Sequence, residues 1–175
     1  MTPLTTKALE IAGRQVGVRE LGRNRGERVE EYQASVGAHP GDPWCSAFVY
    51  WCFEHAAREV GMVNPLPRTA GALKLWRNSA VFRRHKEPAP GMVFVMDKGH
   101  GLGHVGIVEH VQGLELVTIE GNTDDGGSRE GDGVYRRVRK RTAINVGYLD
   151  FGGIDQDADT APIAIAPEES GPIKG

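Results

Sequence analysis

The sequence lacks the features of a membrane protein or of a protein that binds polyanions. No apolar run approaches the roughly 20 residues that a helix needs to cross a bilayer. The 21 basic and 23 acidic residues nearly balance, so the basic excess that neutralises nucleic-acid phosphates is missing. Lys7 and Glu10 interrupt the segment where a signal peptide would be continuously apolar. We therefore expect a protein without a membrane span or a nucleic-acid partner, synthesised in the cytoplasm without a signal peptide.

Cysteine is also scarce, since Cys45 and Cys52 are the only two in the 175 residues. They lie seven residues apart in one predicted helix, and a rise of about 1.5 Å per residue separates them by about 10 Å. A disulfide requires alpha carbons roughly 4.4 to 6.8 Å apart. We therefore expect two free thiols, each available either for chemistry or for simple burial.

Hydrophobic periodicity divides the chain into a helical first half and a strand-rich second half. Apolar positions at helical spacing predict helices at 5–20, 25–35, 44–60 and 69–78. Short β-branched runs between Gly and Asp predict strands at 92–96, 105–111, 114–119, 134–138 and 146–149. Helices followed by strands favour one α+β domain with an antiparallel sheet, covering residues 1–151. Residues 152–175 are rich in Asp, Ala, Pro and Gly, which predicts a disordered tail.

Cys45 opens the predicted helix 44–60, which is apolar on most sides and therefore belongs to the core. A sulfur in this position lies near unpaired backbone N–H groups and the positive end of the helix dipole, which favour the thiolate. The thiolate is the nucleophilic form of cysteine. Cys45 is therefore the candidate nucleophile, with a small buried residue as the alternative interpretation. Cys52 lies two turns deeper and is predicted to be core.

A cysteine nucleophile needs a base, and six histidines are available. Three of them fall in or beside predicted loops and helix surfaces, where a solvated side chain is the usual explanation: His39, His55 and His85. His104 begins a predicted strand between Gly103 and Gly106, whose lack of side chains allows another group to approach closely. His104 is therefore the candidate base. A zinc site built from His100, His104 and Cys45 is a weaker alternative, because histidines four apart suit a helix face.

Pairing between the second and third predicted strands gives His104 a polar neighbour. A three-residue turn at 111–113 would place His104 directly opposite Glu120, with Asn122 one step along the diagonal. One face of the hairpin is then apolar, and the other can fix the tautomer and orientation of the imidazole. The alternative is an ordinary ion pair at the end of a strand.

An oxyanion hole would complete the site, and the backbone N–H of Cys45 is its expected first donor. The second donor stays open between Tyr32 and Trp44. We expect substrate contacts from Trp44 and Ser46. The acidic stretch TDDGGSREGDG at 123–133 does not have the spacing of an EF-hand loop, so neither a metal nor a cofactor is expected.

Four motifs resemble the CHAP family, the cysteine, histidine-dependent amidohydrolases and peptidases. In chain order they are PWCSAFVYW, PAPGMVFVM, GHVGIVEHV and VTIEGNT, and the resemblance spans about residues 9–149. It implies a papain-like fold in which Cys45 is the nucleophile and His104 the base. It also implies that Glu120 and Asn122 are the polar residues that complete the site. Family members typically cleave peptidoglycan, either at the amide joining muramic acid to L-Ala or within the peptide.

The resemblance therefore implies a peptidoglycan hydrolase, either an N-acetylmuramoyl-L-alanine amidase or an endopeptidase. We expect it to act as a phage lysin or as an effector injected into a rival cell, reaching the periplasm or cell wall after delivery. We expect a monomer, with a holin or an immunity protein as a further partner. Two alternatives stay open: an amidase or transpeptidase acting on a small non-wall amide, and a catalytically inactive binding module of the same fold.

Overall fold

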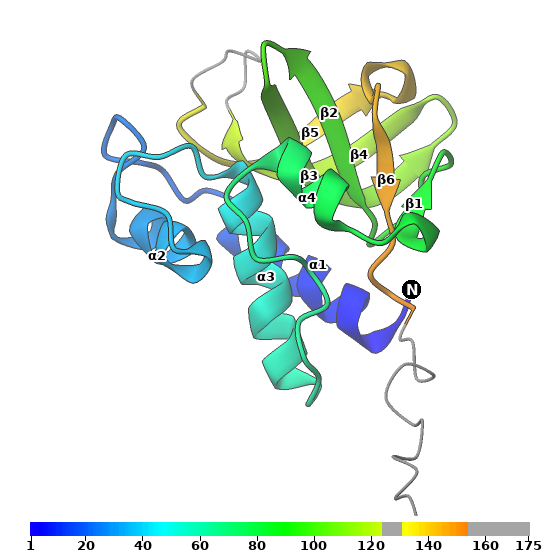
Figure 1. The fold of residues 1–175 in the computed structure, drawn as a ribbon, viewed down its shortest axis with the longest axis horizontal. Helices are drawn as coiled ribbons and strands as arrows, with labels where there is room; N and C mark the ends of the chain where they lie inside the picture. Colours follow the sequence, from blue (N-terminus) through cyan, green and yellow to red (C-terminus); the bar gives the residue numbers. More distant parts are fainter. Residues whose placement is uncertain (124–130, 154–175) are drawn as a thin grey trace, which may run out of the picture.

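The computed structural model describes residues 1–123 and 131–153. Four α-helices come first in the chain and the strands of one antiparallel sheet follow (Figure 1). The helices are α1 (Pro3–Gln15), α2 (Glu27–Val36), α3 (Cys45–Glu59) and α4 (Ala72–Asn78). The strands are β1 (Arg84–His85), β2 (Val93–Gly99), β3 (Leu102–Gln112), β4 (Glu115–Thr123), β5 (Gly133–Lys140) and β6 (Gly147–Leu149). The predicted α+β class with an antiparallel sheet is confirmed.

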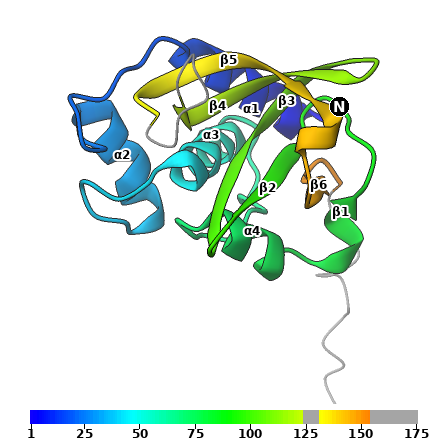
Figure 2. The same cartoon turned by 90° about the horizontal axis from the view of Figure 1, so that it is seen from above.

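The sheet has the strand order β1-β6-β2-β3-β4-β5, so β6 is inserted between β1 and β2. Strands β2 to β5 follow one another as a meander, and helix α4 lies against β2 and β3. Figure 2 shows the sheet as a curved layer beside α1 and α3, with α2 on the side of α3 away from β2 and β6. The two-residue strand β1 was not predicted, because a segment that short has no readable alternation.

Helix α3 is the centre of the domain. It contacts α1, α2, β3 and β4, and its N-terminal end lies against the sheet (Figure 1). Burial on most sides explains why its sequence is apolar almost all round, since 10 of its 15 residues are buried. This packing fixes where the first residue of α3 points, because a buried helix cannot rotate or slide without opening voids in the core.

The ends of the first helices follow local cap chemistry. Helix α1 begins at Pro3, earlier than predicted, because Thr2 and Thr5 cap each other's backbone N–H groups. Helix α2 ends as predicted at Gly37, which adopts the left-handed conformation with φ 75°. Helix α1 ends before residue 20 because Gly17 turns the chain at φ 100°.

The β3–β4 hairpin differs from its predicted register. The turn is formed by Gly113 and Leu114, because Gln112 pairs directly with Glu115. A β-bulge between Val108 and His110 then shifts the pairing again. The predicted three-residue turn was therefore wrong. The bulge was missed because hydrophobic alternation does not reveal a single unpaired residue.

The corrected register changes how His104 meets Glu120. Ile107 pairs with Ile119, and continuing the ladder by one residue brings Gly106 beside Glu120. A Cβ atom at position 106 would lie only 2.7 Å from Cγ of Glu120. The glycine therefore leaves the space through which the Glu120 side chain crosses to His104, its diagonal neighbour on the same face.

The sequence predicts a domain boundary after residue 151 and a tail at 152–175. Residues 154–175 lie outside the described part of the chain, so both stay predictions. Within 1–123 and 131–153, no helix combines the length and the apolar character that a membrane-spanning segment requires.

Candidate active site

Cys45 is the first residue of α3, as predicted, and keeps 7% of its surface exposed. No side chain caps this end of the helix, so the N–H groups of the first turn are not consumed by a capping residue. Cys52 lies further along α3 and is completely buried. Both thiols are free, which confirms the prediction that they form no disulfide.

His104 and Glu120 form a direct hydrogen bond inside the protein. Nε2 of the imidazole lies 2.7 Å from Oε2 of the carboxylate. Only 3% of His104 and none of Glu120 is exposed to solvent. An ionised carboxylate only accepts hydrogen bonds, so Nε2 carries the proton and donates it. The second ring nitrogen, Nδ1, is then free of this proton and available to the Cys45 thiol.

The thiol and the imidazole favour each other's charged forms. Burial alone would raise the pKa of Cys45, but the His104 side chain and the backbone N–H groups of Val105 and Ser46 outweigh it and lower the pKa of the thiol. Burial would likewise lower the pKa of His104, and its interactions with Cys45 and Glu120 raise it instead. The pair can therefore exist as thiolate and imidazolium, the activated state of a cysteine nucleophile.

Glu120 is held by two residues that the sequence reasoning missed. Arg139 donates from Nε to Oε1 and from Nη2 to Oε2, each at 2.5 Å. The hydroxyl of Thr118 donates to Oε1 at 2.6 Å. Burial would raise the pKa of Glu120, but Arg139 and His104 lower it to about 2, so the carboxylate is ionised. Arg139 lies one residue beyond the predicted strand 134–138, among several other basic residues, so the sequence carries no distinct signal for it.

Asn122 lies at the end of β4, in the left-handed conformation with φ 55°. With its amide turned to suit its neighbours, its oxygen accepts from the backbone N–H of Trp44 at 3.1 Å and its nitrogen donates to Oδ1 of Asn24 at 3.2 Å. Asn122 therefore ties β4 to the residue immediately before Cys45. The sequence placed Asn122 diagonally beside His104. In the structure its amide instead bonds the backbone at the start of α3.

The two predicted substrate contacts do not reach a surface. Trp44 is completely buried, stacks on Tyr32 at 5.6 Å between ring centroids and points its indole N–H toward Glu20. Ser46 is also buried, and its hydroxyl donates to the carbonyl of Thr69 at 2.8 Å. The prediction for both residues is corrected accordingly, because they pack the start of α3 from inside.

Neither side chain considered for the second oxyanion donor faces the thiol. The hydroxyl of Tyr32 donates to Oε1 of Gln15 at 2.9 Å, and Trp44 is engaged as described. Backbone N–H groups at the first turn of α3 therefore remain the expected donors to an oxyanion formed at Cys45.

Cys45 opens into a cleft of about 360 Å³ between the start of α3, helix α4 and the β2–β3 turn. Gly103 forms part of its wall, and a Cβ atom there would lie 2.9 Å from Cγ of Leu73. This glycine thus allows β3 to pack closely on α4, as the sequence indicated. The remaining lining residues are Asp42, Pro43, Thr69, Ala70, Gly71, Ala72, Lys74, Arg77, Gly101 and Leu102.

The alternative of a zinc site finds no support in the described residues. No group of three or more His, Cys, Asp or Glu side chains there could hold a metal ion. His100 lies exposed in the β2–β3 turn, while His104 is buried against Cys45 and Glu120. The acidic stretch 123–133 lies for the most part outside the described residues.

A buried thiol at a helix start, paired with an imidazole on an adjoining sheet, defines a cysteine hydrolase site on a papain-like α+β fold. The CHAP domain family model matches residues 37–122, a segment that contains Cys45, His104 and Glu120. Residues 37–122 therefore form a CHAP domain, as the four motifs implied. The comparison with curated proteins finds no match.

Solved structures of two proteins are among those to which this chain is similar. Ly7917 is 20% identical, with a TM-score of 0.48, over 83% of this chain and 60% of its own. Its structure "with the hydrolyzing product of MDP" gives a TM-score of 0.46. The P60 domain of an antigen from M. avium subspecies paratuberculosis is 14% identical, with a TM-score of 0.48, over 86% of this chain and 96% of its own. This chain thus spans less than two thirds of Ly7917.

Proposed function

We propose that this protein is a peptidoglycan hydrolase that cleaves an amide bond of the cell-wall peptide. The observation that carries the proposal is the buried series Cys45, His104 and Glu120, which ends at a thiol facing an open cleft. An inactive binding module has no physical need to keep a carboxylate and an imidazole paired out of contact with water, because burying them costs free energy. The CHAP domain supports the wall as the substrate.

The geometry supports a two-step acyl transfer. His104 takes the thiol proton on Nδ1, and the Cys45 thiolate attacks the carbonyl carbon of the scissile amide. The C–N bond then breaks as the imidazolium gives its proton to the leaving amine, which leaves a thioester on Cys45. Water, deprotonated by His104, attacks the thioester and releases the carboxylic acid and the free thiol. Glu120 keeps the imidazole in the tautomer that both steps need.

We expect the purified protein to release soluble fragments from isolated sacculi. Mass analysis of the products identifies the bond: muramic acid that has lost its whole peptide, together with peptides that begin with a free L-Ala, indicates an amidase, and a cut within the peptide indicates an endopeptidase. The Cys45→Ala variant, treated identically, is the control for contaminating activity. The absence of release from mild acid to mild base would contradict the proposal and favour a small non-wall amide as the substrate. In the cell, we propose a role as a phage lysin or an injected effector that acts in the periplasm or wall.

The cleft wall contributed by α4 carries positive charge. Lys74 and Arg77 both line the cleft and are exposed, and neither forms an ion pair with a described acidic residue. Stem peptides of peptidoglycan carry free carboxylates, which such a wall attracts. We therefore propose that these two cations bind a carboxylate of the substrate beside the scissile amide.

The double variant Lys74→Ala/Arg77→Ala should raise KM for an acidic peptide about 5-fold and leave kcat nearly unchanged, since exposed charge pairs contribute up to about 1 kcal/mol. Steady-state kinetics at low ionic strength measure the effect, because salt screens it. Amidating the substrate carboxylates should abolish the difference between variant and wild type. The variant Lys86→Ala/Lys140→Ala, which removes two exposed cations outside the cleft, is the matched control. An equal KM change in the control would reject a specific subsite.

A further inference from the structure

The carboxylate of Glu120 has a full set of hydrogen-bond donors. Oε1 accepts from Nε of Arg139 and from the hydroxyl of Thr118, and Oε2 accepts from Nη2 of Arg139 and from Nε2 of His104. An ionised carboxylate offers about four lone-pair sites, and all of them are used here. A proton on either oxygen would displace one of these donors, so the donor set is matched to the charged form.

Arg139 supplies half of these donors, and of the two described charges that lower the pKa of Glu120 it is the one that is fixed, since the other is His104. The Arg139 side chain keeps 16% of its surface exposed, and the Glu120 side chain keeps none. A carboxylate completely removed from water is costly unless a cation pairs with it in good geometry. His104 alone cannot do this, because its charge depends on the proton that it exchanges with Cys45.

The other groups around Glu120 do not replace Arg139. Thr118, on the same strand, is neutral and donates one hydrogen bond. Tyr135 is the pairing partner of Glu120 on β5, but its hydroxyl donates to Asp132 and its ring lies under the guanidinium of Arg19. On the remaining sides lie Phe94 of β2, whose ring is 5.9 Å from that of His104, and the Cys45 thiol of α3, which interacts with His104.

We propose that Arg139 is a positioning residue of the thiol site, which holds Glu120 ionised and oriented so that His104 presents Nδ1 to Cys45. The chain of effects runs from the guanidinium on β5 through the carboxylate on β4 and the imidazole on β3 to the sulfur on α3. Arg139 touches neither the thiol nor the cleft. The proposal rests on the thiol chemistry of the proposed function and does not depend on which substrate is cut.

Alkylation of Cys45 by iodoacetamide tests the proposal without any substrate. The thiolate displaces iodide and forms a thioether, so the rate follows the thiolate fraction as the pH is raised. The measurement uses the full chain with Cys52→Ala, which leaves one cysteine. Arg139→Met replaces the guanidinium that lies over the ring of Phe94 with an uncharged, apolar side chain. In this variant the midpoint of the rate profile should rise by at least about one pH unit. Arg139→Lys keeps the charge but not the paired donors, so its midpoint should lie between those of Arg139→Met and the wild type.

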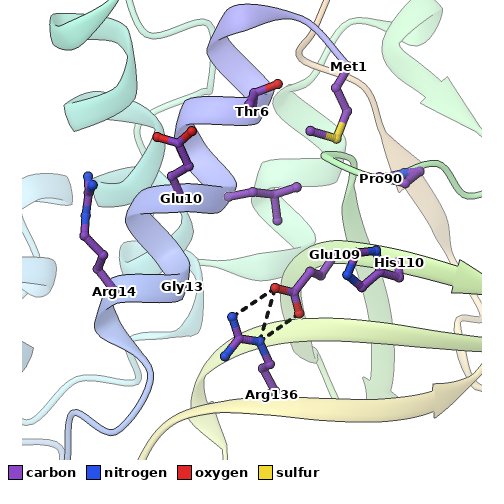
Figure 3. A pocket seen from close by; sticks show the side chains of 10 residues that line it. Met1, Thr6, Glu10, Gly13, Arg14, Pro90, Glu109, His110 and Arg136 are labelled. Atoms are coloured by element: carbon purple, nitrogen blue, oxygen red, sulfur yellow. Dashed lines mark hydrogen bonds and ion pairs between the residues drawn. The ribbon is translucent and has the colours of Figure 1, made fainter.

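Arg136 provides the matched control on the same strand. It lies three residues from Arg139 and so on the opposite face, where its Nε is 2.9 Å from Oε2 of Glu109. Figure 3 shows this ion pair in a separate cavity of about 700 Å³ beside α1. Arg136→Gln removes a guanidinium from β5 without touching Glu120, so its alkylation midpoint should equal that of the wild type.

A wild-type midpoint in folded Arg139→Met would overturn the proposal, as would an equal shift in Arg136→Gln. Should Arg139→Met fail to fold, Arg139→Lys decides the question: a raised midpoint supports the proposal and an unchanged one rejects it. Nitrogen NMR of His104 gives a second readout, since loss of the Nε2–H tautomer in the variants supports positioning and its retention contradicts it. If the protein fails to digest sacculi but the alkylation midpoints shift as expected, only the proposed substrate is rejected.

Discussion

Replacing Cys45 with alanine or serine should abolish the release of soluble fragments from sacculi while the fold is retained. Among the described residues that line the cleft, Cys45 is the one whose side chain interacts with His104 and can become a nucleophile at neutral pH. Loss of a nucleophile of this kind lowers kcat by at least about 10⁴-fold. The side chain is small and keeps contact with the cleft, so the free energy of unfolding should change by less than about 1 kcal/mol. Turbidity loss of sacculi and urea denaturation measure the two effects.

Cys52 is the internal control for this prediction, because it is the same residue type on the same helix. It is completely buried, and burial raises the pKa of its thiol well above the usual range. Cys52→Ala should therefore leave turnover within about 3-fold and lower stability by about 1 kcal/mol, the usual cost of a small cavity. Retained activity in Cys45→Ala together with lost activity in Cys52→Ala would reverse the assignment of the nucleophile.

His104→Ala should lower kcat by at least about 10³-fold, because a positioned base contributes up to about 10⁴-fold. The fold-loss of kcat in Glu120→Ala should be roughly 50 to 100 times smaller than the fold-loss in His104→Ala. The reason is that an orienting carboxylate matters less than the base that it orients. Single-turnover kinetics on a defined peptide compare the chemical steps directly. Equal losses in the two variants would show that Glu120 does more than orient the imidazole.

The same two variants should differ in stability in the opposite order. Glu120→Ala leaves the guanidinium of Arg139 largely buried without its partner, which costs about 3 kcal/mol. His104→Ala keeps the pair between Glu120 and Arg139 intact and should cost less. Denaturant midpoints at neutral pH measure this, and a smaller loss in Glu120→Ala would contradict the role assigned to the ion pair.

The site residues could be predicted from the sequence where the residues next to them in the chain indicate their role. Cys45 follows a turn and opens an apolar helix, and His104 opens a strand between glycines, so both were identified from local pattern and family motifs. Glu120 was also identified, although by a pairing register that proved wrong. It still meets His104 because Gly106 leaves the face open along the diagonal.

Residues whose role depends on distant packing were misjudged or missed. The position of Trp44 beside the thiol predicts substrate contact, yet Trp44 is completely buried and stacks on Tyr32. Arg139 reads in sequence as one of several basic residues on a strand. Its contact with Glu120 arises only after β5 has paired with β4 and the sheet has twisted.

Local patterns were therefore sufficient for the fold class and for the thiol, imidazole and carboxylate, because a helix start, a glycine-flanked strand and strand alternation each depend on adjacent residues. Only the tertiary structure shows the bulged register and the burial of Trp44 and Ser46. It also shows that Asn122 bonds the Trp44 backbone and that Arg139 pairs with Glu120. These features join segments far apart in the chain. Their geometry is fixed by the twist of the sheet and the close packing of α3 beneath it.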